Sequence, residues 1–337
     1  MHSLARVSSV NDLSEASALE PLVSIVVVSW NTRELLAACL RSMQPDTTAG
    51  RAEVWVVDNA SADGSAEMVA SEFPWAELVR AEGNLGFGRA VNLVARRTRR
   101  RWIAPSNADV RLEPGALERL IAAGEADPIA GIVAPMLVLR DGSIQPSIQP
   151  FPTLPHAALL RLRVWRISRR VGERLCLRGY RDPTRGGHVD WAAGAFLLVR
   201  RSAFDQVEGF DEEQWLYAED LDLAWRLGLT GWRTRYQPSA LVHHEESAAA
   251  GKVWGDALPA KWLAATYAWI ARRRGVGRAW SLAAFNVAIS GLEWSAYSIF
   301  AAASSAPRWR EGRLRAREGV RLHRLGLRRR AALRSTR

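Results

Sequence analysis

The feature that most constrains the fold is a short, almost continuous run of apolar, mostly β-branched residues over positions 22–28. Such a run is typical of a strand that is buried on both faces of a parallel sheet. Apolar residues then recur at helical spacing from Leu35 to Met43, and residues 54–57 repeat the pattern of a buried strand. The chain therefore begins with a β-α-β unit.

The same alternation continues along the chain and predicts the fold class. Further helices are expected over residues 65–73, 89–97, 113–123 and 217–229. Further strands are expected over residues 78–79, 102–104, 132–139, 143–145, 195–199 and 232–236. We therefore predict an α/β protein with a doubly wound mixed sheet and flanking helices, in which ligands bind beyond the carboxyl ends of the strands.

Composition divides the chain into three regions. Residues 1–20 are polar, lack the apolar run of a secretory signal and are expected to be flexible. Residues 21–250 hold the alternating pattern, which an Arg-rich insertion at 151–190 interrupts; we expect this insertion to lie over the site. Residues 251–337 are helical in pattern and combine an apolar, aromatic segment at 280–303 with an Arg-rich tail.

The excess of basic residues, 46 against 35 acidic ones, gives a net charge of +11 and indicates an anionic partner. Nucleic acid, a diphosphate or an acidic lipid surface would each fit. The apolar segment beside the Arg-rich tail favours adsorption to an anionic membrane surface over a membrane span, although the tail alone could be a solvated segment. Cys39 and Cys176 lack the spacing of a disulfide framework or zinc site, which favours the reduced cytosol.

Four polar clusters follow predicted strands or open a predicted helix. They are Ser29-Trp30-Asn31 and the segments 58–65, 106–109 and 218–222. Any one of them could be a turn with a helix cap, because Asp, Asn, Ser and Gly are the usual residues there. The carboxyl ends of parallel strands meet at one edge of a sheet, so together the clusters predict a single site.

These clusters together resemble the family-2 glycosyltransferases of the GT-A type, in the branch that includes bacterial rhamnosyltransferases acting on lipid-linked or cell-wall glycans. The resemblance covers residues 22–247. It implies the GT-A fold and an inverting hexosyl transfer from a nucleotide diphosphate sugar, with dTDP-rhamnose as the first choice of donor. The acceptor would be a hydroxyl of a lipid-linked or cell-wall glycan.

The resemblance also implies a nucleotide and donor pocket. Its most specific part is the Val-Asp-Asn-Xaa-Ser-Xaa-Asp-Gly-Ser segment at 57–65, in which Asp58 would accept a hydrogen bond from the pyrimidine ring. The loop at 84–92 matches the family's Asn-Xaa-Gly-Phe loop and is not a dinucleotide-binding GxGxxG turn. The implied nucleotide and donor residues are Ser29, Trp30, Asn31, Asp58, Asn59, Asn84, Gly86, Asn107 and Gly194.

A metal site is implied by the segment Asn107-Ala108-Asp109, whose final carboxylate would hold Mg²⁺ or Mn²⁺ through hard oxygen ligands. Asn107 stands where the common Asp-Xaa-Asp pattern has its first acid, so the protein would offer one carboxylate. A histidine after the last strand would complete the site. His243 and His244 are both candidates, with His243 preferred.

Asp220 is the implied general base, because a sugar hydroxyl is a poor nucleophile until a carboxylate accepts its proton. Neighbouring carboxylates raise one another's pKa, which suits a base. Glu219 and Trp191 would lie on the acceptor side. For Asp222 and Arg226 the spacing favours an ion pair between residues i and i+4 of a helix over a catalytic role.

Two other classes of function would explain part of the sequence. A nucleic-acid-binding protein would explain the basic charge but leaves the acidic clusters at strand ends without a role. A sugar-phosphate nucleotidyltransferase would need a Gly-rich, basic segment after the first strand, where Ser29-Trp30-Asn31 stands. We therefore expect a cytoplasmic enzyme on the inner face of the cell membrane, with no nucleic-acid partner; the sequence does not define its oligomeric state.

Overall fold

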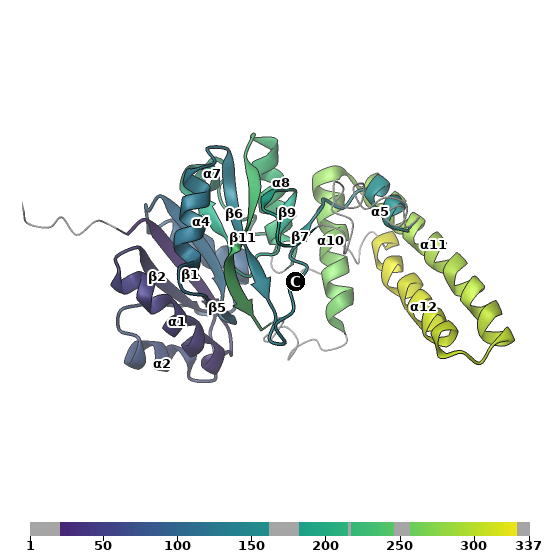
Figure 1. Ribbon diagram of the computed structural model, residues 1–337, viewed down its shortest axis with the longest axis horizontal. Coiled ribbons are helices and arrows are strands. Elements are labelled where there is room, and N and C mark those ends of the chain that lie inside the picture. Colours follow the sequence, from purple (N-terminus) through teal and green to yellow (C-terminus); the bar gives the residue numbers. More distant parts are fainter. Residues whose placement is uncertain (1–20, 162–181, 215–216, 246–256, 329–337) are drawn as a thin grey trace, which may run out of the picture.

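A mixed β-sheet forms the centre of the protein, as the computed structural model in Figure 1 shows. The structure describes residues 21–161, 182–214, 217–245 and 257–328. The predicted flexible N-terminus at 1–20, residues 162–181 of the insertion and the end of the tail at 329–337 lie outside these ranges.

The strand order along the sheet is β3-β2-β1-β4-β10-β6-β11-β5, and β8 pairs with β11. β1 to β4 are parallel, β10 is antiparallel to both of its neighbours, and β11 runs parallel to β6 but antiparallel to β5 and β8. The two short strands β7 and β9 form a second sheet. The bounds are β1 Val23–Ser29, β2 Ala52–Asp58, β3 Glu77–Arg80, β4 Trp102–Asn107, β5 Val110–Leu112, β6 Ala130–Val138, β7 Ile148–Gln149, β8 Gly187–Val189, β9 Trp191–Ala192, β10 Leu198–Arg200 and β11 Arg233–His244.

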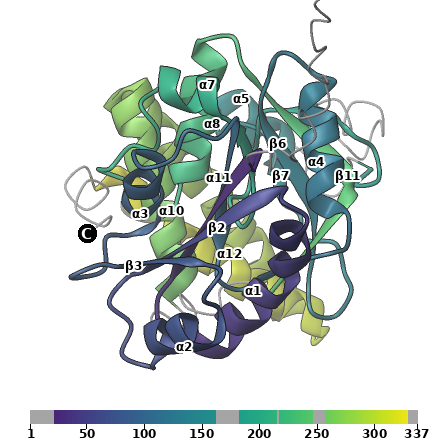
Figure 2. The same ribbon diagram turned by 90° about the vertical axis from the view of Figure 1, so that its left-hand side faces the viewer.

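Helices cover both faces of the sheet, as Figure 2 shows from the side. Ile25 and Val27 of β1 belong to the apolar cluster that includes side chains of α1, α2 and α4, while Val26 belongs to the cluster on the opposite face with α3, α7, α8 and α10. The double-sided burial predicted for this strand and the predicted α/β fold class are confirmed. The bounds are α1 Arg33–Thr48, α2 Ser65–Glu72, α3 Phe87–Ala95, α4 Ala116–Glu125, α5 Leu154–Arg161, α7 Arg201–Gln206, α8 Glu219–Leu229, α10 Leu258–Arg274, α11 Val276–Ala303 and α12 Pro307–Leu327.

Some boundaries differ from the sequence prediction. β11 continues to His244 instead of ending at residue 236, because its pairing with β6 resumes after an irregularity between Gln237 and Leu241. The polar residues of that irregularity interrupt the apolar pattern from which the strand was predicted. The second strand of the expected hairpin at 143–145 is reduced to one bridge between Val138 and Ile144.

The C-terminal helices differ in how they contact the rest of the chain. Tyr267, Trp269 and Ile270 of α10 are buried in the same cluster as Leu221 and Leu223 of α8, so α10 shares the core of the α/β domain although the predicted boundary was residue 250. α11 and α12 form an antiparallel hairpin that projects from the domain (Figure 1). No helix among the described residues is both long and apolar enough to cross a membrane.

Three glycines of α12 let the hairpin pack closely. Gly312, Gly319 and Gly326 are seven residues apart. A Cβ would lie 2.9 Å from the Tyr297 ring at the first position, 2.8 Å from Ser290 Oγ at the second, and 2.7 Å from a ring atom of Tyr267 at the third. Any larger side chain at these positions would therefore push α12 away from α11 and α10.

Candidate active site

The loops that follow β1 and β2 bring the first group of predicted residues together. Asp58 ends β2 directly opposite Ser29, the last residue of β1. The backbone N–H of Asn59 donates to the carbonyl of Ser29 at 2.9 Å, and Asn31 Oδ1 accepts the N–H of Ala62 at 2.8 Å. These hydrogen bonds hold the two loops side by side at one edge of the sheet.

The carboxylate of Asp58 is buried at this edge. Its Oδ2 accepts the N–H of Ser61 at 3.0 Å, whereas Oδ1 has no hydrogen-bond partner among the residues that the structure describes. A buried acceptor without a partner is costly unless a ligand supplies a donor. Asp58 can therefore accept a hydrogen bond from an N–H group of a nucleotide base.

Asn59 connects this group to the loop after β3. Its Oδ1 accepts the N–H of Leu85 at 3.3 Å and its Nδ2 donates to the carbonyl of Gly86 at 3.4 Å. Asn84 Oδ1 accepts the N–H of Gly86 at 2.9 Å, and Gly86 has a φ of 78° that favours glycine. The side chains of Asn59 and Asn84 thus shape the loop.

Asn107 joins the first group to the rest of the site. It ends β4 opposite Val28 of β1, and Trp30 follows two residues later in the chain. The N–H of Asn107 donates to the carbonyl of Ala195 at 2.9 Å, next to Gly194. The predicted donor residues therefore lie along a continuous edge of the sheet.

Asp109 and His244 face each other where β5 pairs with β11. Both residues are buried, and His244 Nε2 lies 3.4 Å from Asp109 Oδ1. His243 points the other way, as alternation along a strand requires, and its Nε2 lies 2.5 Å from Glu113 Oε1. The structure therefore brings His244, and not the preferred His243, to the predicted metal carboxylate.

The environment of His244 suits a metal ligand. Its Nδ1 lies 2.8 Å from Gln145 Oε1, and an N–H donated to that oxygen leaves the lone pair of Nε2 directed at the Asp109 carboxylate. A cation between these two electron-rich atoms would make their approach favourable. In the described part of the chain no three His, Cys, Asp or Glu side chains form a metal-binding group. Asp109 and His244 could thus offer two ligands to a divalent ion, with the others left to substrate phosphate and water.

The Asp220 carboxylate is held at the start of α8 by backbone donors. The N–H of Gly194 donates to Oδ2 at 2.8 Å and that of Leu221 to Oδ1 at 2.7 Å. A Cβ at Gly194 would lie only 3.2 Å from that of Asp220, so glycine permits this contact. Gly194, one of the implied donor residues, therefore contacts the predicted base directly.

Burial raises the pKa of both acids that open α8, Glu219 and Asp220. Burial and the neighbouring charge of Asp220 raise the pKa of Glu219 to about 8. Burial also raises the pKa of Asp220, to about 6, although backbone hydrogen bonds from Leu221 and Gly194 oppose the shift. Both shifts favour proton uptake by this pair of acids, and the backbone N–H groups that bond Asp220 favour the ionised form of that residue.

Trp191 lies under the site. Its ring is buried in the cluster that contains Ala218 and Leu221, and its Nε1–H donates to the carbonyl of Pro150 at 3.1 Å. The expected ion pair between Asp222 and Arg226 is confirmed, with Arg226 Nε 2.6 Å from Asp222 Oδ2. The buried Trp191 ring thus does not offer an open face to a ligand.

Sequence reasoning missed two kinds of residue at this site. Gln145, which orients His244, has no motif around it. Tyr217 and Ala218 both have positive φ values, 62° and 63°, directly before α8. Consecutive non-glycine residues in this conformation are strained and occur mainly at functional sites, but no sequence signal marks them.

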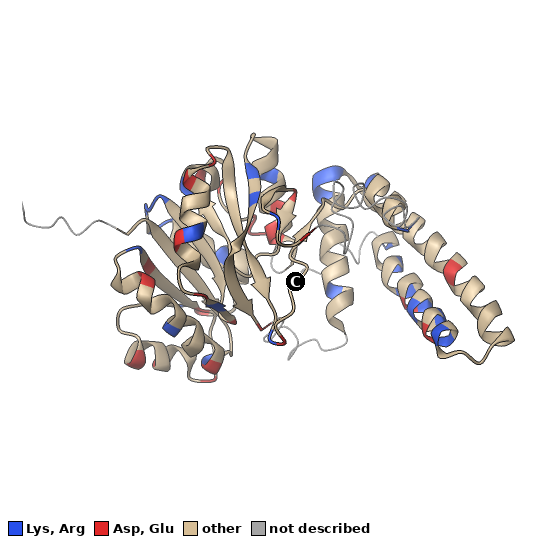
Figure 3. Ribbon diagram, in the orientation of Figure 1, with Lys and Arg blue, Asp and Glu red and all other residues tan. Residues whose placement is uncertain are grey.

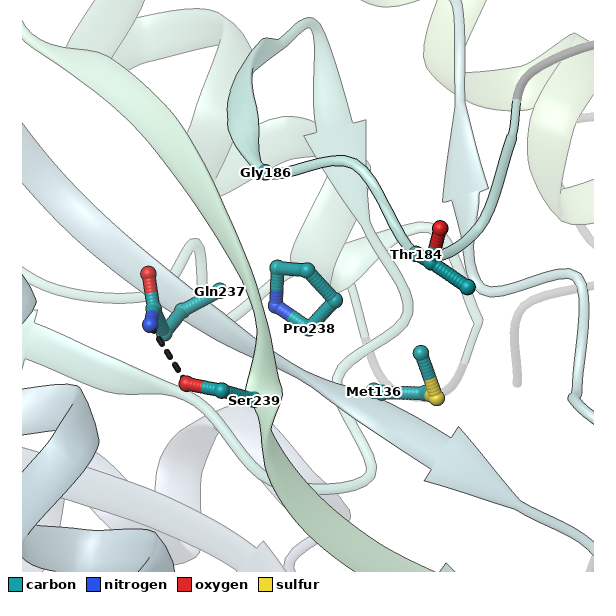
Figure 4. Close-up of a pocket in the computed structure, with 6 residues that line it drawn as sticks. All are labelled: Met136, Thr184, Gly186, Gln237, Pro238 and Ser239. Atoms are coloured by element: carbon teal, nitrogen blue, oxygen red, sulfur yellow. Dashed lines mark hydrogen bonds between the residues drawn. The ribbon is translucent and has the colours of Figure 1, made fainter.

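The structure also contains a separate cavity of about 380 Å³ (Figure 4). Its lining residues come from β6, β11 and the segment before β8, and they are Met136, Thr184, Gly186, Gln237, Pro238 and Ser239. None of them is a predicted site residue. The candidate active site is instead the edge of the sheet described above.

A mixed sheet of this order, with acidic side chains at its strand ends, is the arrangement of the GT-A fold. Residues 24–207 match the family model Glycosyl transferase family 2, and residues 182–306 match Glycosyl transferase family group 2. The chain belongs to glycosyltransferase family 2. The predicted family, fold and enzyme class are confirmed.

Two proteins that are similar in sequence to this chain are rhamnosyltransferases. The chain is 34% identical over 274 residues to the N-acetylglucosaminyl-diphospho-decaprenol L-rhamnosyltransferase of Mycobacterium tuberculosis (strain CDC 1551 / Oshkosh), covering 75% of this chain and 85% of that protein. It is 40% identical over 91 residues to the rhamnosyltransferase WbbL of Escherichia coli K12, covering 26% of this chain and 32% of that protein.

A solved structure supports the fold. The mannosyltransferase PcManGT from Pyrobaculum calidifontis, in complex with GDP-Man and Mn²⁺, has a TM-score of 0.58 and 20% identity to this chain. The match covers 94% of this chain and 86% of that one. At this level of identity the likeness establishes the GT-A fold.

Proposed function

We propose that this enzyme transfers L-rhamnose from dTDP-L-rhamnose, with inversion, to a hydroxyl of a sugar carried on a lipid diphosphate. The similarity over most of both chains to a rhamnosyltransferase that is named for such an acceptor supports the donor sugar and the acceptor class. The observation that carries the reaction type is the buried carboxylate of Asp220, which the N–H groups of Gly194 and Leu221 hold at the start of α8.

In the proposed mechanism Asp58 accepts a hydrogen bond from the base of the donor nucleotide. Asp109 and His244 would hold a divalent ion, which when bound neutralises charge on the diphosphate. Asp220 takes the proton of the acceptor hydroxyl as its oxygen attacks the anomeric carbon. The bond from that carbon to the diphosphate breaks on the opposite face, and its electron pair leaves with the nucleotide diphosphate.

The first test is a donor and acceptor assay with the full chain. We expect transfer from dTDP-L-rhamnose to a short-chain lipid analogue of N-acetylglucosamine diphosphate, and a product whose anomeric configuration, read by NMR, is inverted. GDP-mannose and UDP-N-acetylglucosamine serve as control donors. Transfer from a control donor alone would contradict rhamnose as the sugar, and retention would contradict the single-displacement mechanism.

We also propose that the α11–α12 hairpin adsorbs to the inner face of the cell membrane, where a lipid-linked acceptor would lie. The outer side of α11 carries exposed apolar residues, including Leu292 at 67% and Ile299 at 68% exposed, and its one acid, Glu293, is paired with Arg161 at 3.0 Å. Figure 3 shows that α11 carries few charged residues and lies beside the basic residues of α12. Apolar area and nearby arginines reinforce each other at an anionic surface.

Vesicle flotation tests this membrane contact. Replacing Arg310, Arg317 and Arg324 by Gln should weaken binding to anionic vesicles by at least about tenfold and make it less sensitive to salt, since each arginine contributes about 1 kcal/mol there. Leu292→Ser with Ile299→Ser should weaken binding to all vesicles. A matched control is Leu229→Ser, which removes a side chain that is 72% exposed on α8. Equal binding of all variants would contradict the proposal.

A further inference from the structure

The Asp222 carboxylate lies two residues beyond Asp220 on α8 and is fully buried. Arg226 of the same helix donates to it, but the other two donor residues belong to α10. Trp269 Nε1–H donates to Oδ1 at 3.0 Å, and Arg273 donates to Oδ1 at 2.6 Å through Nε and to Oδ2 at 3.2 Å. Burial opposes the charge, but Arg273 and Arg226 outweigh it and lower the pKa of Asp222.

α10 also holds the backbone on the other side of Asp220. Arg272 donates to Gln214 Oε1 at 2.5 Å, and the buried Gln214 donates through Nε2 to the carbonyl of Tyr217. Tyr217 is the first of the two residues with positive φ before α8. Arg273 adds an ion pair to Asp211 at 2.6 Å, at the start of the same segment.

We propose that Arg273 is a positioning residue for the reaction: together with Trp269 it fixes Asp222, and through it the first turn of α8, so that Asp220 meets the acceptor hydroxyl. This inference rests on the proposed role of Asp220 as base. The segment before Asp220 and the residue two positions after it both form hydrogen bonds with α10. The Asp220 carboxylate therefore lies between two points that α10 holds. α10 thus positions the first turn of α8 for catalysis.

The expected effect is on catalysis more than on substrate binding. The hydrogen bonds of Asp58 and His244 go to Ser61 and Gln145 and not to α10, so we expect donor affinity to depend little on Arg273. A displacement of about 1 Å at a reacting group can lower the rate about a hundredfold. We therefore expect Arg273→Gln to lower kcat by about ten- to a hundredfold while KM for donor and acceptor changes less than about threefold.

Three companion variants separate positioning from simple destabilisation. Arg274→Gln is the matched control, because Arg274 lies next in α10 and donates to the carbonyl of Pro152 at 3.0 Å without contacting Asp222; its kcat should stay near that of the parent. Arg273→Lys keeps the charge and should restore part of kcat. Trp269→Phe keeps a ring but removes one donor to Asp222, and should lower kcat several-fold.

Steady-state kinetics on the full chain, with circular dichroism as the check on folding, decide between the outcomes. A selective fall in kcat for Arg273→Gln with partial recovery for Arg273→Lys supports positioning. If Arg273→Gln does not fold, an unchanged kcat in both Arg273→Lys and Trp269→Phe overturns the inference. An unchanged kcat in a folded Arg273→Gln also overturns it, while Asp220→Asn tests the base independently: full activity there would instead refute the proposed function of Asp220.

Discussion

Asp220→Asn should lower the rate of glycosyl transfer by about a thousandfold while donor affinity stays within about twofold, because the amide keeps the shape of the side chain but cannot take the acceptor proton. The structure gives Asp220 the two properties that a base needs. Its carboxylate is held by the N–H groups of Gly194 and Leu221, and its pKa is raised toward neutrality by burial.

The sign of the pH dependence follows from that shift. Only the ionised form of Asp220 can accept a proton, and its pKa is raised to about 6. The value of kcat should therefore fall as the pH drops through about 6, and the residual activity of Asp220→Asn should lack this limb.

Glu219→Gln is the matched control for Asp220→Asn. Burial and the neighbouring Asp220 carboxylate raise the pKa of Glu219 and so favour its protonated form, which an amide of the same size resembles, and the rate should fall by less than about tenfold. The measurements are kcat at several pH values and donor binding by calorimetry. Loss of transfer in Glu219→Gln together with retained transfer in Asp220→Asn would reverse the assignment of the two acids.

The second large effect is expected at Asp109 and His244. Asp109→Ala should lower transfer by about a hundredfold or more, because an ion that neutralises the leaving diphosphate contributes several kcal/mol to the transition state. Nucleotide binding should weaken mainly when Mg²⁺ or Mn²⁺ is present. His244→Ala should lower ion-dependent binding by about ten- to a hundredfold.

His243 provides a control one residue away on the same strand. Its side chain contacts Glu113 and not Asp109, so His243→Ala should retain ion-dependent nucleotide binding. Titration of the nucleotide with and without a chelator measures both effects. Equal weakening of binding with and without the ion would argue against a metal role for Asp109, and a larger loss in His243→Ala than in His244→Ala would reverse the choice of histidine.

Much of the fold could be predicted because the central strands are buried on both faces and their helices are amphipathic. Residues 22–28 and 54–57 carry the first signal and residues 35–43 the second, and the structure forms β1, β2 and α1 there. β11 was predicted too short because its continuation depends on β6 and β5, which pair with residues 241–244 beyond the polar segment at 237–239. Such pairing is a property of the sheet and has no local pattern.

The site was predictable to the extent that its residues follow strands. Asp58, Asn107 and Asp109 end or follow β2 and β4, where any parallel sheet gathers its loops. The choice between His243 and His244 was not predictable, because it depends on the phase of β11, which pairs His244 with Val110. The contact of Arg273 with Asp222 joins residues 51 apart and is defined only once α10 packs on α8.

The three glycines of α12 make this helix dependent on its neighbour. Glycine inside a helix is less favourable than alanine by about 1 kcal/mol at each position, and the many arginines of α12 repel one another along its exposed side. By itself the segment Pro307–Leu327 would therefore favour the coil. It gains its helical form from close contact with α11, so the two helices should fold and unfold as one cooperative unit, and the arginines are held in a row only while α11 is in place.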